Sequence, residues 1–465
     1  MSKMKFKITL LFILLMLAIF CSSCIDGRDM EDGFAFYYNS STDDQSIYDI
    51  TISAGVHVEL PSEHNGHPIT SLNDTDSTLF ELPAIYQTLI LPDTLKTINR
   101  NFYYGASKFL KYNEYDNGLY LGTKDNPYFA FIKVKEVDYP EEMSYNLGNQ
   151  IDTNEKDGFP PPLYLPNETD VTTLKLHPDT KIIANEAFAG CKKLKSITIP
   201  GTIKRIPVGA FAGCFALEEV IIEEGVEEIL GSAFLYCDSL EYLLIPNTVK
   251  KAAYFLGKSW NRESMIKIEL AYGMEKIPDG MFKECDYLES IVIPNSVKEI
   301  GKEAFAFSPS LKRITLSENL EYIGEQAFRE CVSLSEIYFS ETLKKIDEMA
   351  FSSCVSISSI KLPKSLEYIG DHAFSACTSL ISLVISENIE YIGSYAFANC
   401  GDLNEIFIPK NFTQGSWSTF KGTHTEAIYY DGTLEEWEEL CKKNNLYIVY
   451  GSVIGLDDID DENSV

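Results

Sequence analysis

The chain has 465 residues and a formal net charge of −30 at pH 7, from 69 Asp and Glu against 39 Lys and Arg. Hydrophobic residues make up 45% and charged residues 23%, which is ordinary for a folded chain. The acidic balance argues against nucleic-acid binding, which needs clustered Lys and Arg to neutralise phosphates. It agrees with a soluble, self-repelling surface protein.

Residues 1–24 have the composition of a secretory signal. A lysine-rich start precedes an apolar run, Ile8–Phe20, that is too short to cross a hydrocarbon core of about 30 Å as a helix. The run ends at Cys21-Ser22-Ser23-Cys24, which resembles a bacterial lipobox with Cys24 as the acylated residue, although Cys21 stands where an aliphatic residue is usual. The acidic residues that follow resemble the export signal of outer-surface lipoproteins of the Bacteroides group. The resemblance implies a chain exported to the bacterial outer membrane or cell surface and touching membrane through its lipid anchor only. Ordinary signal cleavage, with Cys24 incidental, is the alternative.

Residues 34–110 are predicted to form an N-terminal cap followed by a first repeat unit. Tyr48–Leu60 has strand-like content, and a turn-rich stretch, Pro61–Ile69, follows it. Residues 88–110 then carry apolar side chains at the spacing of one repeat, namely Leu89, Leu91, Leu95, Ile98, Phe102 and Leu110. The end of a repeat array exposes its core unless it is capped, so a cap is expected on physical grounds.

Residues 111–170 depart from the repeat and are predicted to be an excursion. Asn117-Gly118 is a hairpin-type turn signal between two strand-like segments, and Tyr128–Val134 is a further strand. From Asp138 to Asp170 the chain is polar and contains three consecutive prolines, which indicates a loop.

Residues 171–426 form the array proper, whose signature is a phenylalanine that recurs every 23 residues. The series consists of Phe188, Phe211 and Phe234, then Phe282, Phe305, Phe328, Phe351, Phe374, Phe397 and Phe420. A fixed period of 20 to 29 residues with leucine-like spacing is typical of a leucine-rich repeat solenoid.

One unit, residues 288–310, shows the physics. Ile291 and Ile293 face the core from a short strand and Val292 points outward, because side chains alternate along a strand. Gly301–Phe307 is predicted to be a short helical or 3₁₀ turn. No unit can bury its apolar face alone, so the units must stack. The phenylalanines are then expected to form a ladder at about the 4.7–4.9 Å spacing of adjacent strands.

The repeat motif I-x-I-P-x-x-V-x-x-I-G-x-x-A-F-x-x-C resembles the BspA-like class of leucine-rich repeats, found on bacterial and some protozoan surface proteins. The resemblance implies an α/β-type repeat solenoid of 23-residue units, made mostly of short parallel strands with short helical or 3₁₀ turns and capped at both ends. One unit departs from the motif: between Asn247 and Asn261, Tyr254-Phe255 replaces Ala-Phe and the cysteine is missing. We expect a local bulge there.

Residues 427–450 are predicted to be the C-terminal cap. A strand at Ile428–Tyr430 is followed by Thr433-Leu434-Glu435-Glu436, a capping box at the start of a short helix that carries Trp437. Residues 451–465 are expected to be an acidic disordered tail.

The cysteines and histidines do not point to chemistry. Eight of the 11 cysteines lie three residues after a repeat Phe, and single spacings of 23 match no zinc pattern. An inert buried ladder of thiols is the favoured interpretation, and disulfides between stacked coils are geometrically permitted. No nucleophile with an oriented base is evident, and no phosphate loop. We expect no catalytic site, cofactor or metal.

The outward strand positions are the candidate functional surface. They form one column along the first strands (Thr198, Ile221, Leu244, Glu269, Val292, Thr315, Tyr338, Lys361, Val384 and Phe407) and a second column of tyrosines after each Glu (Tyr322, Tyr368 and Tyr391). Exposed apolar area tends to mark interaction sites, although strands also favour such residues for their own sake. The predicted partner-binding face consists of Thr315, Tyr322, Tyr338, Tyr368, Val384, Tyr391 and Phe407.

The family resemblance implies an adhesin-like protein whose solenoid binds host extracellular or cell-surface proteins, or neighbouring cells. An envelope-structural or self-associating protein is the alternative. A less favoured one is an enzyme or glycan-processing accessory with its site in residues 111–170.

Overall fold

The structure is a computed structural model, and it describes residues 28–31, 34–39, 44–50, 57–72, 88–99, 110–135, 170–256, 266–412, 418–423, 425–444 and 452–456. The chain divides into two compact units. The first unit comprises Met1–Asn113 with Tyr120–Ile132, and the solenoid unit comprises Glu114–Leu119 with Lys133–Val465. The predicted signal and Cys24 lie outside the described residues.

The first unit contains the predicted cap. Strands β1 (Arg28–Glu31), β2 (Phe34–Asn39) and β3 (Asp44–Ile50) pair in antiparallel order. Strand β6 (His67–Leu72) pairs in parallel with β3 and with β8 (Thr97–Ile98). A separate parallel pair consists of β4 (His57–Glu59) and β7 (Thr88–Ile90). β5 (Glu63–His64) and β6 form a hairpin across Asn65-Gly66, both of which have positive φ. Strands β1 and β2 were not predicted. Leu89, Leu91, Leu95 and Ile98 are buried, as the first repeat requires.

The predicted excursion begins with two strands joined by a turn one residue earlier than the expected Asn117-Gly118. Strands β9 (Asn113–Tyr115) and β10 (Gly118–Leu121) are hydrogen-bonded neighbours joined by a turn at Asp116-Asn117, and β11 (Ala130–Val134) follows. Asp116 adopts φ 48°, which the short polar side chain of Asp tolerates. Residues 136–169, most of the predicted loop, lie outside the described residues.

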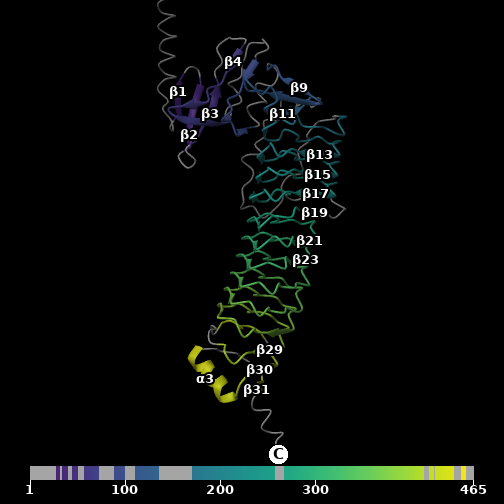
Figure 1. Ribbon diagram of the computed structural model, residues 1–465. Helices are drawn as coiled ribbons and strands as arrows, with labels where there is room; N and C mark the ends of the chain where they lie inside the picture. The colour runs from purple at the N-terminus through teal and green to yellow at the C-terminus, as the bar shows by residue number, and fades with distance from the viewer. Residues whose placement is uncertain are drawn as a thin grey trace, which may run out of the picture. The chain divides into compact units, whose positions relative to one another are not determined.

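The array is a β-solenoid in which most coils contribute two short strands (Figure 1). The first row contains β13 (Ser196–Ile199), β15 (Glu219–Ile222), β17 (Tyr242–Ile245), β19 (Lys267–Leu270), β21 (Ser290–Val292), β23 (Arg313–Thr315), β27 (Ser382–Val384), β29 (Glu405–Ile408), β30 (Ala427–Tyr430) and β31 (Ser452–Gly455). The second row contains β12 (Ile182–Ile183), β14 (Arg205–Ile206), β16 (Glu228–Ile229), β18 (Lys251–Ala252), β20 (Lys276–Ile277), β22 (Glu299–Ile300), β24 (Tyr322–Ile323), β25 (Lys345–Ile346), β26 (Tyr368–Ile369) and β28 (Tyr391–Ile392). Neighbouring coils pair in parallel, for example Ser196 with Glu219 and Glu299 with Tyr322.

The core is a ladder of phenylalanine rings. Phe305, Phe328, Phe351 and Phe374 are fully buried, and successive ring centroids are 5.1, 5.0 and 5.1 Å apart with interplanar angles of 2–7°. In the irregular unit, Phe255 is fully buried and touches Phe234 edge-on at 6.2 Å. Phe255 therefore keeps the core continuous where the motif fails, although residues 257–265 of that unit lie outside the described residues.

The corners that carry these rings are not the helical or 3₁₀ turns that we expected. At Gly301–Phe307 the N–H groups alternate between two kinds of partner. Ala304 donates within its own coil to Gly301, whereas Phe305 donates to Ala327 of the next coil at 2.7 Å. A 3₁₀ helix would need successive N–H groups to bond within the segment. Glu303 and Phe307 adopt left-handed φ values of 54° and 59°, which break any helix. Consecutive turns therefore replace the helix, and they hydrogen-bond the coils to one another.

The predicted C-terminal cap contains a strand, β30, and the helix that follows it. Helix α3 (Leu434–Asn444), the only helix longer than a single residue in the described part of the chain, begins at a capping box in which Thr433 N–H donates to Glu436 at 3.0 Å and Glu436 N–H donates to Thr433 Oγ1 at 3.3 Å. Trp437 is buried against Tyr430 at 5.4 Å. Ser452–Gly455, which we expected to lie in a disordered tail, instead form β31 beside β30.

Candidate interaction surfaces

The first-row column lies on the outer side of its strands, as predicted. Thr315 and Tyr338 are exposed, Tyr338 to 77%, and so is Val384, while Phe407 is half-buried. The column extends further than the prediction, because Phe407 is opposite Tyr429 on β30 and Tyr429 is opposite Ile454 on β31. The rings of Phe407 and Tyr429 stack at 4.5 Å. Sequence reasoning identified the strand at Tyr429 without assigning its outward residue, although alternation along Ile428–Tyr430 carried that signal.

The predicted tyrosine column belongs to the second row and is half-buried. Tyr322 donates a hydrogen bond from its hydroxyl to Asp347 at 2.5 Å, and Tyr368 stacks on Tyr391 at 4.9 Å. Lys345 lies between Tyr322 and Tyr368, with its Nζ 5.3 and 4.9 Å from the two ring centroids. Burial, followed by the hydrogen bond to Asp347, raises the pKa of Tyr322. These rings are therefore engaged with each other and with a lysine of their own chain.

The predicted face consists of two surfaces. Thr315, Val384 and Phe407 lie on first-row strands, whereas Tyr322, Tyr368 and Tyr391 lie on strands of a separate second-row sheet. Periodicity separates inward from outward positions, but it does not say which side of a coil a strand occupies. The structure brings the apolar first-row residues together and leaves the tyrosine ladder apart from them.

Charge alternates along most of the second row and then stops alternating. Lys181 precedes β12, and from β14 onward the residue before each of these strands is, in order, Lys204, Glu227, Lys250, Glu275, Lys298, Glu321, Lys344, Glu367 and Glu390. Lys250 pairs with Glu227 at 3.1 Å, and Lys344 with Glu321 at 3.1 Å. Glu367 and Glu390 are exposed neighbours of the same sign. The last coils of the array are therefore the ones with uncompensated negative charge.

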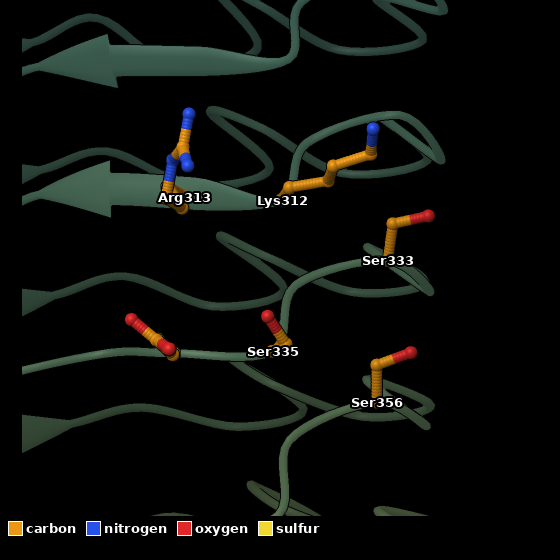
Figure 2. Close-up of a pocket in the computed structure, with 6 residues that line it drawn as sticks. Lys312, Arg313, Ser333, Ser335 and Ser356 are labelled. Carbon is orange, nitrogen blue, oxygen red and sulfur yellow. The ribbon is translucent and has the colours of Figure 1, made fainter.

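A shallow depression of about 410 Å³ opens on the first row (Figure 2). Arg313 is the first residue of β23 and Lys312 precedes it, Ser333 and Ser335 come from the next coil, and Ser356 lies beyond them. Lys312 pairs with Glu289 at 2.6 Å, which lowers the pKa of that carboxyl. This site was not predicted, although Ser333 and Ser356 are 23 positions apart and occupy one column of the repeat.

The repeat cysteines are buried free thiols in the structure. Six of the eight (Cys214, Cys237, Cys331, Cys354, Cys377 and Cys400) donate to a phenylalanine carbonyl of the preceding coil, as Cys354 does to Phe328 at 3.0 Å. Ser308 occupies the same column and donates to Phe282 at 2.8 Å. Burial raises the pKa of Cys331 and of Cys400 to about 12, which keeps the thiols protonated as donors. The favoured interpretation of the column as a buried ladder agrees with this geometry.

Among the described residues, no set of three or more His, Cys, Asp or Glu side chains is arranged to hold a metal ion. In the same part of the chain, no helix has the length and apolar content needed to cross a bilayer.

Comparison with known proteins identifies the repeat. The chain matches the BspA type leucine rich repeat region in six copies, over residues 165–261, 257–354 and 327–448. No curated protein matches it.

Similar solved structures include the pneumococcal vaccine antigen PcpA, with 18% identity over 93% of this chain and 100% of that one and a TM-score of 0.43. A leucine-rich cell surface protein from Faecalibacterium prausnitzii A2-165 has 19% sequence identity and a TM-score of 0.34. The match covers 92% of this chain and 100% of that one. A leucine-rich repeat protein from Bacteroides ovatus ATCC 8483 has 17% identity, 92% and 100% coverage and a TM-score of 0.35. Because the matched repeat regions span more than half of the sequence, the chain belongs to the BspA-type leucine-rich repeat family.

Proposed function

We propose that the chain is an adhesin-like cell-surface protein whose solenoid binds a protein of a host or a neighbouring cell. The family suggests a protein-interaction role, and one observation carries the proposal further. Val384, Phe407, Tyr429 and Ile454 form an in-register row on the outer side of the sheet β27-β29-β30-β31, which we call the apolar row.

The apolar row combines exposure with order. Val384 is 55% exposed. Because the rings of Phe407 and Tyr429 already stack on each other, neither ring has to be ordered when a partner binds. Rigid aromatic side chains lose little conformational entropy in an interface, and contiguous exposed apolar surface marks interaction sites. Strand propensity favours such residues in every coil, and the stacking of Phe407 on Tyr429 across two coils is the observation that goes beyond it.

The charges around the apolar row favour a basic partner. Glu405 lies on the same side of β29 as Phe407, because the two residues are two positions apart on one strand. Asp402, Glu405 and Glu426 are exposed, and none of them forms an ion pair with a described residue. A second copy of a chain with charge −30 would bring like charges together at this face. The fitting occupant is an extracellular protein with an apolar patch bordered by Lys and Arg.

A matched pair of valines tests the row. Val384 and Val292 occupy the same outward position and are 55% and 65% exposed, but only Val384 lies in the apolar row. Extracellular proteins captured by the chain from Ile25 onward are identified, purified and titrated against Val384→Ser, Phe407→Ala and Val292→Ser. We expect Phe407→Ala to weaken binding by about 2 kcal/mol, or roughly 30-fold. Val384→Ser should weaken it less, and Val292→Ser should leave it unchanged.

Two outcomes would contradict this proposal. Equal affinity of all three variants would remove the apolar row from the interface. Concentration-dependent self-association in sedimentation, lost in Phe407→Ala, would favour the envelope-structural alternative. The predicted residues outside the row, Thr315, Tyr338 and the tyrosine ladder, are tested by the same titration with Tyr338→Ala and Tyr368→Ala.

Export and lipid anchoring are further parts of the proposal. We infer acylation at Cys24, with stable anchoring from several acyl chains because a single chain binds membranes only marginally. The experiment is metabolic labelling of the full chain with an alkyne fatty acid in a Gram-negative host. Cys24→Ser should lose the label and Cys21→Ser should keep it. Label retained in Cys24→Ser would favour ordinary signal cleavage.

A further inference from the structure

The first-row sheet is open where the depression lies. Strand β23 meets the following coil only through a single bridge between Arg313 and Glu336, and pairing resumes at the bridge between Ser359 and Ser382. Ser335 N–H donates to the Lys312 carbonyl at 3.4 Å, but within residues 266–412 no backbone hydrogen bond joins Ser335 to the next coil. The second row continues without a break across the same coils, from β24 through β25 to β26. The opening is therefore confined to one side of the solenoid.

The depression in this opening is lined entirely by polar side chains. Lys312, Arg313, Ser333, Ser335, Glu336 and Ser356 surround a volume of about 410 Å³ (Figure 2). That volume is within the roughly 300–1,000 Å³ of small-molecule sites, which are usually lined by apolar and aromatic groups. A lining without apolar side chains fits a ligand that is itself covered with hydrogen-bonding groups.

Arg313 is the group that can hold a negative charge. The residue is exposed, and its guanidinium forms no ion pair with a described residue, although Glu336 is its cross-strand neighbour. By contrast, Lys312 beside it is engaged by Glu289 at 2.6 Å. The positive charge of Arg313 also helps to lower the pKa of Glu289, but without an ion pair its guanidinium presents a planar fork of donors that matches a carboxylate in bidentate geometry.

The remaining groups suit hydroxyls. Ser333 and Ser335 form no side-chain hydrogen bond with a described residue, so each offers a donor and an acceptor. Ser356 donates to the Val332 carbonyl at 2.6 Å and keeps its oxygen lone pairs. The carboxylate of Glu336 can only accept, and it therefore needs an O–H or N–H donor.

We propose that this depression binds an acidic saccharide, a sugar unit that carries one carboxylate, as uronic acids do. The sugar carboxylate pairs with Arg313, and the ring hydroxyls bond to the serines and donate to Glu336. An acidic peptide fits less well, because only its backbone N–H groups can donate to Glu336 and its carboxylate side chains bring no hydroxyls to the serines. This inference goes beyond the proposed protein-binding function, since it concerns a different part of the first row and a different class of ligand.

The test is calorimetric titration of the chain from Ile25 onward with galacturonic acid oligomers. The matched ligand control is the same oligomer with its carboxyl groups reduced to alcohols, which keeps every hydroxyl and removes the charge. We expect measurable binding of the acid and binding of the reduced oligomer weaker by about tenfold or more. A poly-glutamate peptide of equal length tests the competing ligand class.

Two variants locate the site. Arg313→Gln should weaken binding of the acid by about tenfold, because it removes the bidentate fork from an exposed residue without disturbing the core. Lys181→Gln removes the same charge at an exposed residue far along the array and should leave binding unchanged. Absence of binding by any galacturonic acid oligomer, equal binding of the reduced oligomer, equal binding of poly-glutamate, or equal losses in the two variants would each overturn the proposal.

Discussion

Replacing Phe328 by Ala removes one ring from the middle of the phenylalanine ladder. The ring is fully buried and stacks on Phe305 at 5.1 Å and on Phe351 at 5.0 Å. Truncation of a buried Phe to Ala costs about 3–5 kcal/mol, and each aromatic pair adds about 0.5–1.5 kcal/mol beyond burial. Since Phe328 has partners on both sides, we expect the upper end of this range, a loss of about 5 kcal/mol.

The control is Phe339→Ala, which deletes the same atoms from a half-buried residue. Phe339 touches the ladder once, edge-on to Phe351 at 5.7 Å. We expect the free energy of unfolding of this variant to fall by about 1–2 kcal/mol, because the half-buried ring of Phe339 contributes less burial free energy than a fully buried one. Both variants are compared with the unmodified chain by urea unfolding, monitored by far-ultraviolet circular dichroism.

A second readout makes the test local. The Phe328 carbonyl accepts hydrogen bonds from Cys331 N–H at 3.1 Å and from the Cys354 thiol at 3.0 Å. Because coils contact only their neighbours, the damage should stay close to the missing ring. Thiol alkylation followed by peptide mass spectrometry should show faster labelling of Cys331 and Cys354 and unchanged labelling of Cys191. A loss below about 2 kcal/mol, or uniformly faster labelling of all thiols, would refute the ladder as the main source of stability.

Three further outcomes follow from the geometry. A Cβ at Gly225, where φ is +114°, would lie 2.3 Å from the Gly201 carbonyl oxygen, so Gly225→Ala should destabilise the chain by more than about 2 kcal/mol in urea unfolding. Burial raises the pKa of Cys331 from 9.0 to about 12. The contribution of this thiol to the free energy of unfolding is therefore complete below about pH 9. It is lost as the pH rises towards 12, because over this range the thiol ionises in the unfolded chain but not in the folded one. Cys331→Ser should therefore show a flatter fall in urea midpoint over that range, and identical slopes would contradict the assignment. Thr433→Ala should cost about 1 kcal/mol in thermal unfolding followed by the fluorescence of a chain in which Trp437 is the one remaining tryptophan, whereas Glu436→Gln keeps the capping acceptor and should cost less.

The sequence predicted the burial of a residue correctly wherever one residue type recurs at the same position of the repeat. Phe328 and Cys354 stand in columns that must be inward because no other arrangement buries them, and both are buried. The capping box at Thr433 was equally readable, because its two hydrogen bonds depend on residues three positions apart. In each case a short stretch of sequence contains all the partners involved.

Features that depend on several coils were not readable in the same way. The ring of Phe255 turns edge-on because the unit around it lacks the regular motif, and no local pattern specifies a ring angle. The tyrosine ladder lies on a different sheet from Val384, since alternation fixes the depth of a residue but not the side of the coil. The corners became consecutive turns because half of their N–H groups find partners in the next coil, a choice that single-unit propensity does not contain.

The buried thiols also determine what happens after a coil opens. In the folded chain the repeat thiols are buried, and six of the eight donate to a phenylalanine carbonyl, so they react slowly with oxidants. Once two neighbouring coils separate from the core, two thiols become reactive together and oxidise to a disulfide that the native coils do not contain. Unfolding in an oxidising medium therefore becomes irreversible at that step, and the lifetime of the protein depends on how often coils open rather than on the free energy of unfolding.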